Sequence, residues 1–395
     1  MKILTFTTLF PNNVQPLAAN FVRERMVRAA GSFDLRVVAP VPWSPPLPLN
    51  DRWGQFRRVC RSEDIGGIEV HHPRYALIPR IGMSMHGCMM FASTHRFLRE
   101  LRRSYPFDLI DAHYIYPDGL AAVLHGQRLG VPVVLSARGS DVNVFPQFRT
   151  IRPWIRYALR EAASVISVSI ALKRKMVQLG CPEAKIHVIP NAVDHRIFRR
   201  MNRSEARREL GEALAGKMLL SVGNLKPAKG FRLLLEAFDR LRDRLPDVRL
   251  RIIGDGPDRG FLARRINELG LDTTITLVGT VPNGDLPLWY CAADAFALAS
   301  EGEGNPNVVN ESLACGTPVV TADLWEGELP YGSDQGVTAE RLEPEAFAIA
   351  MESVLNREWD PEAVASAMRP YTWDDVSLQL TQVFAAAING RQQPR

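Results

Sequence analysis

The chain has 395 residues, of which 46% are hydrophobic and 23% charged, as in an ordinary globular protein. One hydrophobic core stops growing at about 250–300 residues, so two domains are expected. No apolar run is long enough to span a bilayer, and the first residues lack a signal-peptide pattern. The five cysteines are scattered and have no metal-ligand spacing, which argues against a disulfide framework and a metal site. These features favour a cytoplasmic protein.

The net charge of +5 is unevenly placed along the chain. Residues 1–190 carry 25 Lys and Arg against 13 Asp and Glu, a difference of +12, whereas residues 191–395 carry 23 against 30, a difference of −7. The basic half is therefore expected to face something anionic, such as a phosphorylated substrate or the inner face of a membrane, unless it is simply a solvated basic surface. A nucleic-acid partner is not expected, because no recognition module is visible.

Apolar runs typical of buried strands alternate with helical patterns along the whole chain. In the first half these runs are residues 3–8, 35–39, 109–112, 131–136, 165–168 and 187–189. In the second half they are residues 218–222, 249–253, 274–278, 295–298 and 318–321. Such runs predict an α/β fold with two doubly wound, parallel-sheet domains that meet near residues 191–203. Ligands bind beyond the carboxyl ends of such strands, so a cleft between two facing sheets is expected to hold the site.

The segment SEGEGNPNVVNESLACGTPVV, residues 300–320, is the most informative in the chain. A helix is predicted to begin at Pro306 with Asn305 as its N-cap, and to end before Gly316. The backbone N–H groups of Asn307 and Val308 would then be available to a phosphate group.

Two glutamates flank that helix start. Glu311 lies one turn beyond Asn307 on the same helix face, where it suits ribose hydroxyls better than phosphates. Glu303 lies on the loop before the helix, where it could contact a transferred sugar or stabilise positive charge at its anomeric carbon.

This segment resembles the E-x7-E signature of family 4 glycosyltransferases. Glu303, Gly304, Asn307, Val308 and Glu311 occupy signature positions, whereas Glu301 has the wrong spacing. The resemblance extends along nearly the whole chain and is closest to bacterial enzymes of cell-surface polysaccharide synthesis. It implies a GT-B fold, with an acceptor-side domain at residues 1–195, a donor-binding domain at 196–365 and a last helix, 366–395, that packs back on the first domain.

The family resemblance also implies an activity. It implies a retaining, metal-independent transfer from a nucleoside-diphosphate sugar, used as a co-substrate without a further cofactor, to the hydroxyl of a carbohydrate or lipid-linked acceptor. Peripheral membrane contact through the basic N-terminal domain would fit such an acceptor.

Further positions of the donor site are assigned by the same resemblance. Lys229 matches the basic residue that holds the pyrophosphate, while Asn224 stands where the family has an arginine. The GDGP turn places Gly256 near the ligand, and Val281 corresponds to the position beside the nucleobase. On the acceptor side, Asp141 matches the family's His-Gly-x-Asp motif, Arg138 replaces its histidine, and His113 matches the H-x-x-Y-P-x-G loop. The resemblance implies that these three residues, with Glu303 and Lys229, are catalytic.

Three other functions compete with this interpretation. A dinucleotide-dependent dehydrogenase would show G-x-G-x-x-G after the first strand, and this chain does not. A sugar-nucleotide epimerase of the same fold would convert free donor without an acceptor. A non-catalytic sugar-nucleotide-binding protein is compatible with the departures at Asn224 and Arg138.

Overall fold

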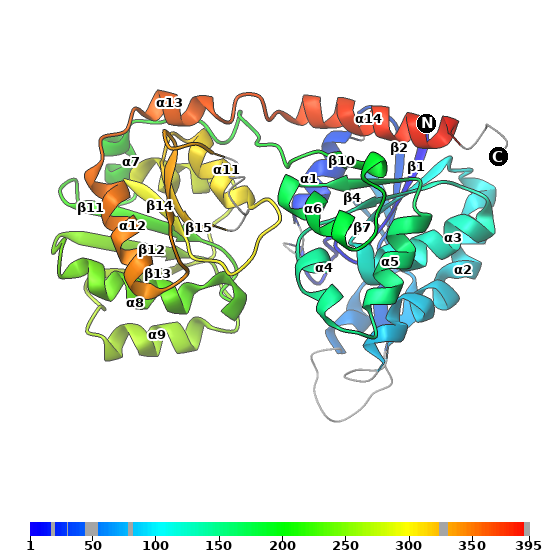
Figure 1. Cartoon of the computed structure of the whole chain (residues 1–395), viewed down its shortest axis with the longest axis horizontal. Helices are drawn as coiled ribbons and strands as arrows, with labels where there is room; N and C mark the ends of the chain where they lie inside the picture. The colour runs from blue at the N-terminus through cyan, green and yellow to red at the C-terminus, as the bar shows by residue number, and fades with distance from the viewer. Residues whose placement is uncertain (17–19, 30, 44–53, 78–81, 324–330, 391–395) are drawn as a thin grey trace. The chain divides into compact units, whose positions relative to one another are not determined.

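The computed structural model describes residues 1–16, 20–29, 31–43, 54–77, 82–323 and 331–390. The chain divides into two compact α/β units (Figure 1). Unit 1 comprises Met1–Asn191 together with Trp373–Arg395, and unit 2 comprises Ala192–Thr372. The sequence placed these boundaries at 195/196 and 365/366.

Unit 1 contains, within the described residues, an eight-stranded sheet of order β10-β9-β8-β7-β1-β2-β5-β4. Its strands are β1 (Lys2–Phe6), β2 (Asp34–Val38), β4 (Ser62–Ile65), β5 (Ile68–His71), β7 (Leu109–His113), β8 (Val133–Ser136), β9 (Ser164–Ser167) and β10 (Ile186–Val188), with β3 (Val41–Trp43) and β6 (Arg74–Ala76) pairing separately. Its helices are α1 (Asn20–Ala29), α2 (His86–Ser104), α3 (Leu120–Leu129), α4 (Ser140–Asn143), α5 (Arg152–Glu161), α6 (Ile170–Gln178) and α14 (Trp373–Asn389). The C-terminal helix α14 packs against α1, β7 and β8 (Figure 1).

Unit 2 contains, among the residues described, a six-stranded parallel sheet of order β13-β12-β11-β14-β15-β16. Its strands are β11 (Lys217–Val222), β12 (Val248–Ile253), β13 (Ile275–Gly279), β14 (Ala295–Leu298), β15 (Val319–Ala322) and β16 (Gly336–Ala339). Its helices are α7 (Arg203–Glu209), α8 (Phe231–Arg242), α9 (Arg259–Glu268), α10 (Leu286–Ala292), α11 (Asn307–Ala314), α12 (Pro344–Asn356) and α13 (Pro361–Ser366).

Each sheet has one topological switch point. In unit 1 the chain leaves β1 for β2 on one side and later returns to β7 on the other. In unit 2 it leaves β11 for β12 and returns to β14 on the opposite side. The loops that follow the two flanking strands diverge at such a point, which is where open α/β sheets bind ligands. We therefore expect a site after β1 and β7 in unit 1, and after β11 and β14 in unit 2.

The strands predicted from apolar runs are all present, with ends shifted by at most two residues. The expectation of wholly parallel sheets is wrong for unit 1, because β4 pairs antiparallel to β5. Gly66 and Gly67 join these strands with φ of 64° and 82°, and a two-residue turn with positive φ at both positions is the standard hairpin connection.

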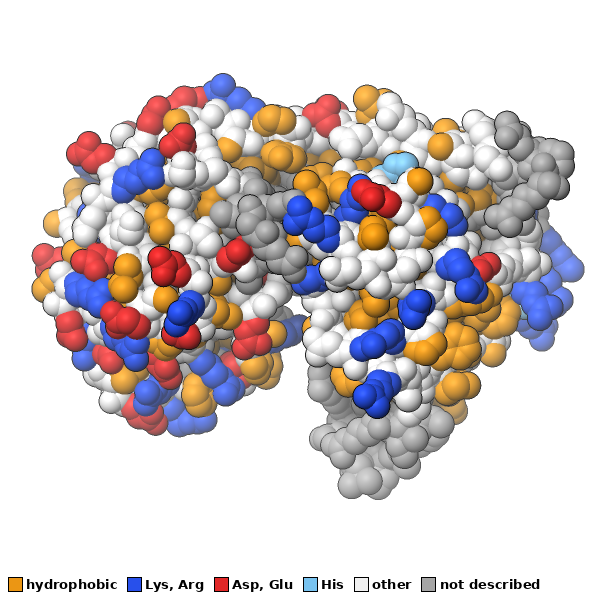
Figure 2. All heavy atoms as spheres, in the orientation of Figure 1, with side chains coloured by type: hydrophobic (Ala, Val, Ile, Leu, Met, Phe, Trp, Pro, Cys, Tyr) orange, Lys and Arg blue, Asp and Glu red, His pale blue; other side chains and the backbone are white. Residues whose placement is uncertain are grey.

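The surface charges of the two units differ as the sequence indicates. On the face drawn in Figure 2, unit 1 shows Lys and Arg with few acidic side chains, whereas unit 2 mixes both signs. Helix α2 buries a stripe that includes Met90, Leu98 and Leu101, as a sheet-covering helix does. In the described ranges, no helix is both long enough and apolar enough to cross a membrane.

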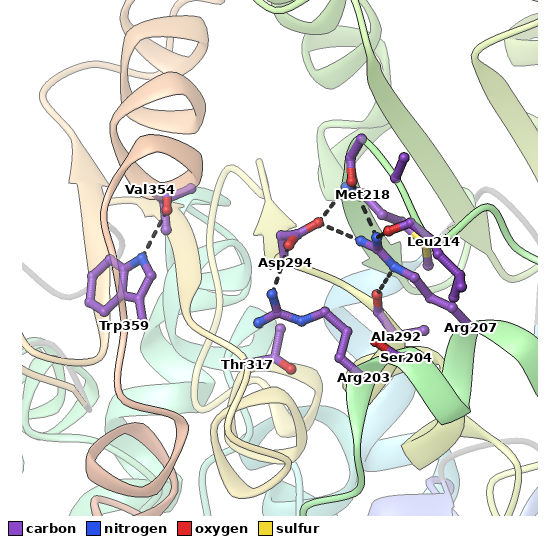
Figure 3. A network of polar contacts seen from close by, with 12 residues as sticks. Arg203, Ser204, Arg207, Leu214, Met218, Ala292, Asp294, Thr317, Val354 and Trp359 are labelled. Atoms are coloured by element: carbon purple, nitrogen blue, oxygen red, sulfur yellow. Dashed lines mark hydrogen bonds and ion pairs between the residues drawn. The ribbon is translucent and has the colours of Figure 1, made fainter.

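A buried carboxylate joins three segments of unit 2 (Figure 3). Asp294 Oδ2 accepts from Arg207 Nη2 at 2.6 Å and from the backbone N–H of Met218 at 2.7 Å. Its Oδ1 accepts from Arg203 Nη1 at 2.9 Å. The Arg207 side chain is buried and also donates to the carbonyl of Ala292 at 2.9 Å. Asp294 thus ties α7 to the starts of β11 and β14.

A second buried carboxylate crosses the switch point of unit 1. Asp118 lies in the short helix η3 (Ile115–Gly119) after β7, and Thr7 and Thr8 follow β1. Asp118 Oδ2 accepts from the Thr8 N–H at 2.6 Å, the Thr8 hydroxyl at 2.9 Å and the Thr7 hydroxyl at 3.3 Å. Burial raises the pKa of Asp118 to about 7, although the hydrogen bonds from Thr8 and Thr7 oppose that rise.

Replacing Asp294 with alanine is expected to destabilise the protein by about 3–5 kcal/mol, because the buried Arg207 guanidinium loses its counter-ion. Urea unfolding followed by circular dichroism measures the change. Glu268→Ala is the matched control, since it breaks only the exposed Arg265–Glu268 pair and should change the free energy of unfolding by less than about 1 kcal/mol. Equal changes in the free energy of unfolding for the two substitutions would contradict the stabilising role of the Asp294 network.

Asp118 predicts a pH dependence of stability. Its folded pKa of about 7 lies above the ordinary value of 3.8, so its stabilising contribution is complete at low pH and is lost as the pH rises through 7. Between about pH 5 and pH 8 the wild type should lose about 2–3 kcal/mol relative to Asp118→Asn. Urea midpoints of both proteins across this range measure the difference, and a constant difference would contradict the prediction.

Candidate functional site

The two loops at the switch point of unit 2 are in direct contact. Gly230, which follows the short helix η6 (Pro227–Lys229), has φ of 69°. A Cβ there would lie 1.7 Å from the carbonyl oxygen of Ala299, just after β14, so only glycine fits. The Ser300 hydroxyl and the Glu301 N–H both donate to the carbonyl of Ala228, at 3.0 and 3.2 Å. The loop after β11 is thereby fixed against the loop after β14.

Lys229 and Glu303 meet across these loops. Lys229 Nζ donates to Glu303 Oε1 at 2.5 Å, although 74 residues separate them in sequence. Both side chains are partly buried. An ammonium and a carboxylate therefore lie together beyond the carboxyl ends of β11 and β14, the position at which this kind of sheet binds ligands.

Helix α11 begins four residues after Glu303. Its N-cap is Pro306, in an extended conformation, and its first residue is Asn307. The predicted start at Pro306 with Asn305 as N-cap is therefore wrong by one residue. Asn305 instead accepts from the Asn310 side-chain amide at 2.9 Å. Gly304, Asn307 and Val308 keep their expected places at the start of the helix.

The end of α11 agrees with its prediction. The Gly316 N–H donates to the carbonyl of Leu313 and the Thr317 N–H to that of Ser312, at 2.8 and 3.0 Å. With φ of 78° at Gly316, this is a Schellman motif. The motif satisfies the terminal carbonyls and leads directly into β15.

Glu311 has a partner that the sequence did not indicate. The Tyr290 hydroxyl, from α10, donates to Glu311 Oε2 at 2.9 Å. Burial raises the pKa of Glu311 to about 7, although the hydrogen bond from Tyr290 opposes the rise. The second glutamate of the signature is thus held in place by a buried phenol and can gain or lose its proton near neutral pH.

The remaining donor-side residues lie on two further loops. A Cβ at Gly256 would lie 2.6 Å from the carbonyl oxygen of Leu225 and 2.8 Å from Asn224 Oδ1, so the GDGP turn packs directly on the loop after β11. Asn224 and Lys226 are exposed there. Val281 lines a hollow of about 740 Å³ together with Arg196, Trp289 and neighbouring residues, and its place beside a nucleobase stays a prediction.

In unit 1, His113 links a strand carboxylate to a loop guanidinium. Its Nε2 lies 2.8 Å from Asp111 Oδ2, and its Nδ1 is contacted by Nη2 of Arg138. A guanidinium can only donate, so Nδ1 accepts and Nε2–H donates to Asp111. Burial lowers the pKa of His113 to about 4. The imidazole is therefore neutral at pH 7 and serves to orient Arg138.

Asp141 holds backbone atoms. Its carboxylate accepts from the N–H groups of Ile115, Arg138 and Gly139, at 2.9, 3.0 and 2.8 Å. These bonds occupy both oxygens and fix the loops after β7 and β8 to each other. The geometry therefore supports a positioning role for Asp141, and the catalytic role that the sequence predicts for it stays a prediction.

The sequence patterns assigned no function to two charged residues of this region, Asp111 and Arg25. Asp111 lies two residues before His113 on β7, and residues i and i+2 of a strand share one face, so the D-x-H spacing was a readable signal. Arg25 lies on α1 among the buried Val22, Met26 and Ala29 and is itself 1% exposed. An arginine within the apolar stripe of a helix was the corresponding signal.

Within the described part of the chain, no group of three or more His, Cys, Asp and Glu side chains is arranged to hold a metal ion. The groups that converge at the two switch points are cations, carboxylates and backbone N–H groups. Such groups suit the binding of a polyanionic or hydroxyl-rich ligand.

Comparison with known proteins identifies the family. Residues 216–357 match the family Glycosyl transferases group 1, and residues 59–196 match Glycosyltransferase Family 4. A Bacillus subtilis (strain 168) protein, whose name assigns it provisionally to teichuronic acid biosynthesis as glycosyltransferase TuaC, is 29% identical over 375 residues, 92% of this chain and 91% of its own. The D-inositol 3-phosphate glycosyltransferase of Actinosynnema mirum is 30% identical over 329 residues, 75% of this chain and 77% of its own.

A solved structure extends the likeness to the whole fold. Anabaena HepE in complex with UDP superposes with a TM-score of 0.71 at 18% identity, over 98% of this chain and 100% of that one. The fold is accordingly GT-B, built from two Rossmann-like domains. Both family models match in order along the sequence, and a relative is 30% identical over 75% of this chain. The chain therefore belongs to the family 4, or group 1, glycosyltransferases and is an enzyme of sugar transfer.

Proposed function

We propose that this glycosyltransferase takes its sugar from a nucleoside-diphosphate sugar, which binds to unit 2 at the loops after β11 and β14. The observation that carries the proposal is the contact between Lys229 and Glu303 at the switch point, close in sequence to the first turn of α11. The complexes of Anabaena HepE with UDP and with UDP-glucose support a uridine nucleotide as the first candidate to test.

The proposed roles follow from charge. The Lys229 ammonium and the N–H groups at the start of α11 would bind the diphosphate and stabilise the charge that develops on it as it leaves. Glu311, positioned by Tyr290, would accept hydrogen bonds from the ribose. Glu303 would orient the transferred sugar and stabilise positive charge at its anomeric carbon, while its contact with Lys229 positions the ammonium.

Transfer with retention is proposed from the family resemblance. In that chemistry the acceptor hydroxyl attacks from the face that the diphosphate leaves, and an oxygen of the leaving group takes the hydroxyl proton. The bond from the anomeric carbon to the diphosphate breaks as the bond to the acceptor oxygen forms, so the reaction needs no further reactant.

The acceptor is proposed to be a carbohydrate or a lipid-linked carbohydrate of polysaccharide or glycolipid synthesis. The names of two relatives support this: one refers to teichuronic acid biosynthesis and the other to D-inositol 3-phosphate. A peripheral contact between the basic unit 1 and an anionic membrane would bring such an acceptor within reach.

A screen of nucleotide sugars tests the function as a whole. A ligand that binds only the folded state raises the melting temperature with its occupancy, so thermal shift identifies the donor. Mass spectrometry of the products then tests the proposed donor and acceptor. A glycosylated acceptor supports both, whereas conversion of free donor or binding without any product would contradict the proposal.

Lys229→Met is expected to weaken UDP binding by about 10- to 100-fold, because a charge-assisted hydrogen bond contributes about 1.5–3 kcal/mol. Isothermal titration calorimetry measures the affinity. Lys217→Met is the matched control, since this exposed lysine begins β11 at the opposite end of the strand, and it should bind UDP like the wild type. An unchanged affinity in Lys229→Met would remove Lys229 from the donor site.

Glu303→Gln is expected to lower kcat by at least about 100-fold while changing the dissociation constant of UDP by less than about threefold. Glutamine keeps the shape of the side chain but cannot stabilise positive charge on the sugar. Glu301→Gln provides the control, because this exposed neighbour has the wrong spacing for the signature. Equal turnover in the two variants would contradict the role of Glu303.

A further inference from the structure

Arg25 is a buried cation without a hydrogen-bond partner among the described residues. Its side chain is 1% exposed, and none of Nε, Nη1 and Nη2 has an acceptor in that part of the chain. It lies on α1, the helix that follows β1, and the charge of Asp111 on β7 is close enough to raise its pKa. Burial outweighs that effect and lowers the pKa of Arg25 to about 10, so the guanidinium is still charged at pH 7.

Arg138 offers unused donors in the same region. Its Nη2 contacts His113, its guanidinium carbon lies 5.7 Å from the centre of the Phe21 ring on α1, and its Nε and Nη1 have no hydrogen-bond partner. Burial, and then the charge of Arg25, lower the pKa of Arg138 to about 9. Phe21 and Arg25 are four residues apart on α1 and share one helix face, so the Arg138 guanidinium, from the loop after β8, lies beside the face of α1 that carries Arg25.

The supply of hydrogen-bond donors exceeds the acceptors within reach. An arginine has only donors, and its forked geometry matches the oxygens of carboxylate and phosphate. In this cluster Asp111 has one unpartnered oxygen, Oδ1, and Ser136 has an unpartnered hydroxyl. The other carboxylate, Asp141, already accepts from three backbone N–H groups. Arg25 carries about five N–H donors and Nε and Nη1 of Arg138 carry about three more, so the unpartnered oxygens of Asp111 and Ser136 cannot satisfy all of them.

Buried charges of this kind are costly unless something compensates them. Leaving a guanidinium desolvated and unpaired opposes folding. A bound oxyanion would remove that cost, because it supplies several acceptor oxygens and a negative charge at once.

We infer that Arg25 and Arg138 form a site in unit 1 for an oxyanionic group, a phosphate or a carboxylate, carried by the acceptor. Only one part of this inference rests on the proposed function, namely that the acceptor carries the anion. Unit 2 has its own groups for a diphosphate, Lys229 and the start of α11, so the donor does not require a second cationic site in the other unit.

The Asp111–His113 pair gives this site its geometry. Because neutral His113 accepts from Nη2, the Arg138 guanidinium is held at one edge, and Nε and Nη1 are left without a hydrogen-bond partner among the described residues. An uncharged acceptor would supply no counter-charge to these two arginines, of which Arg25 is buried and Arg138 is partly buried. The site therefore restricts the substrate class to anionic carbohydrates or their lipid-linked forms.

Calorimetric titration of the full chain at low ionic strength tests the site. The probes are inorganic phosphate and glucuronate, with glucose as the neutral control and UDP as the donor control. Arg25→Met removes the charge and keeps the bulk of the side chain, while Arg99→Met removes the same charge from an exposed position of α2. The wild type and Arg99→Met should bind at least one anion with equal affinity, Arg25→Met should bind it at least about tenfold more weakly, and all three should bind UDP equally.

The melting temperature provides a second readout. Without anions, Arg25→Met should melt at or above the wild-type temperature, because replacing an uncompensated buried charge with an apolar side chain of similar volume removes a cost. A lower melting temperature together with retained anion affinity would make Arg25 a structural partner of Asp111 and overturn the inference.

Two further results would also overturn it. Failure of the wild type to bind either anion would show that no such site exists, while UDP binding in the same protein would leave the proposed function intact. A loss of UDP affinity in Arg25→Met would assign the arginines to the donor. Failure of UDP and every other nucleotide sugar to bind, with anion affinity retained, would instead count against the proposed function alone.

Discussion

The proposed donor site of this enzyme depends on how closely two loops approach each other at the switch point of the unit 2 sheet. The backbone after β14 passes Gly230 at a distance that leaves no room for a Cβ, and hydrogen bonds to the Ala228 carbonyl fix the contact. Because the loops cannot separate without breaking these contacts, Lys229 and Glu303 are held together before any ligand arrives. A preorganised pair of this kind stabilises charge during a reaction without having to reorganise.

Unit 1 uses the equivalent point of its sheet differently. Its polar groups are buried rather than gathered on an accessible loop, and most of them hold other groups in position. Asp118 joins the loops after β1 and β7, Asp141 joins those after β7 and β8, and His113 transmits the position of Asp111 to Arg138. The same sheet topology thus carries a half-buried ion pair in one unit and an interior network of fixed charges in the other.

Sequence patterns predicted the strands well because parallel strands covered on both faces are continuously apolar. They also located the end of α11, since glycine at C′ followed by proline is a local signal. The start of α11 was wrong by one residue because Pro306 adopts the extended conformation of a cap rather than a helical one. The partners of the signature residues were not predictable in this way. Tyr290 meets Glu311, and Lys229 meets Glu303, only after separate βα units have packed, and no local periodicity records such contacts.

The departure from the family pattern at Arg138 makes physical sense only together with residues outside any motif. A guanidinium in place of the family's histidine brings a permanent charge into a buried region, and Arg25 adds a second one on a neighbouring helix. A single buried cation could be balanced by Asp111, but the second leaves donors without acceptors. Two such residues retained in one place would be unfavourable for folding alone. Their presence is therefore better explained by a ligand that completes the network than by the stability of the fold.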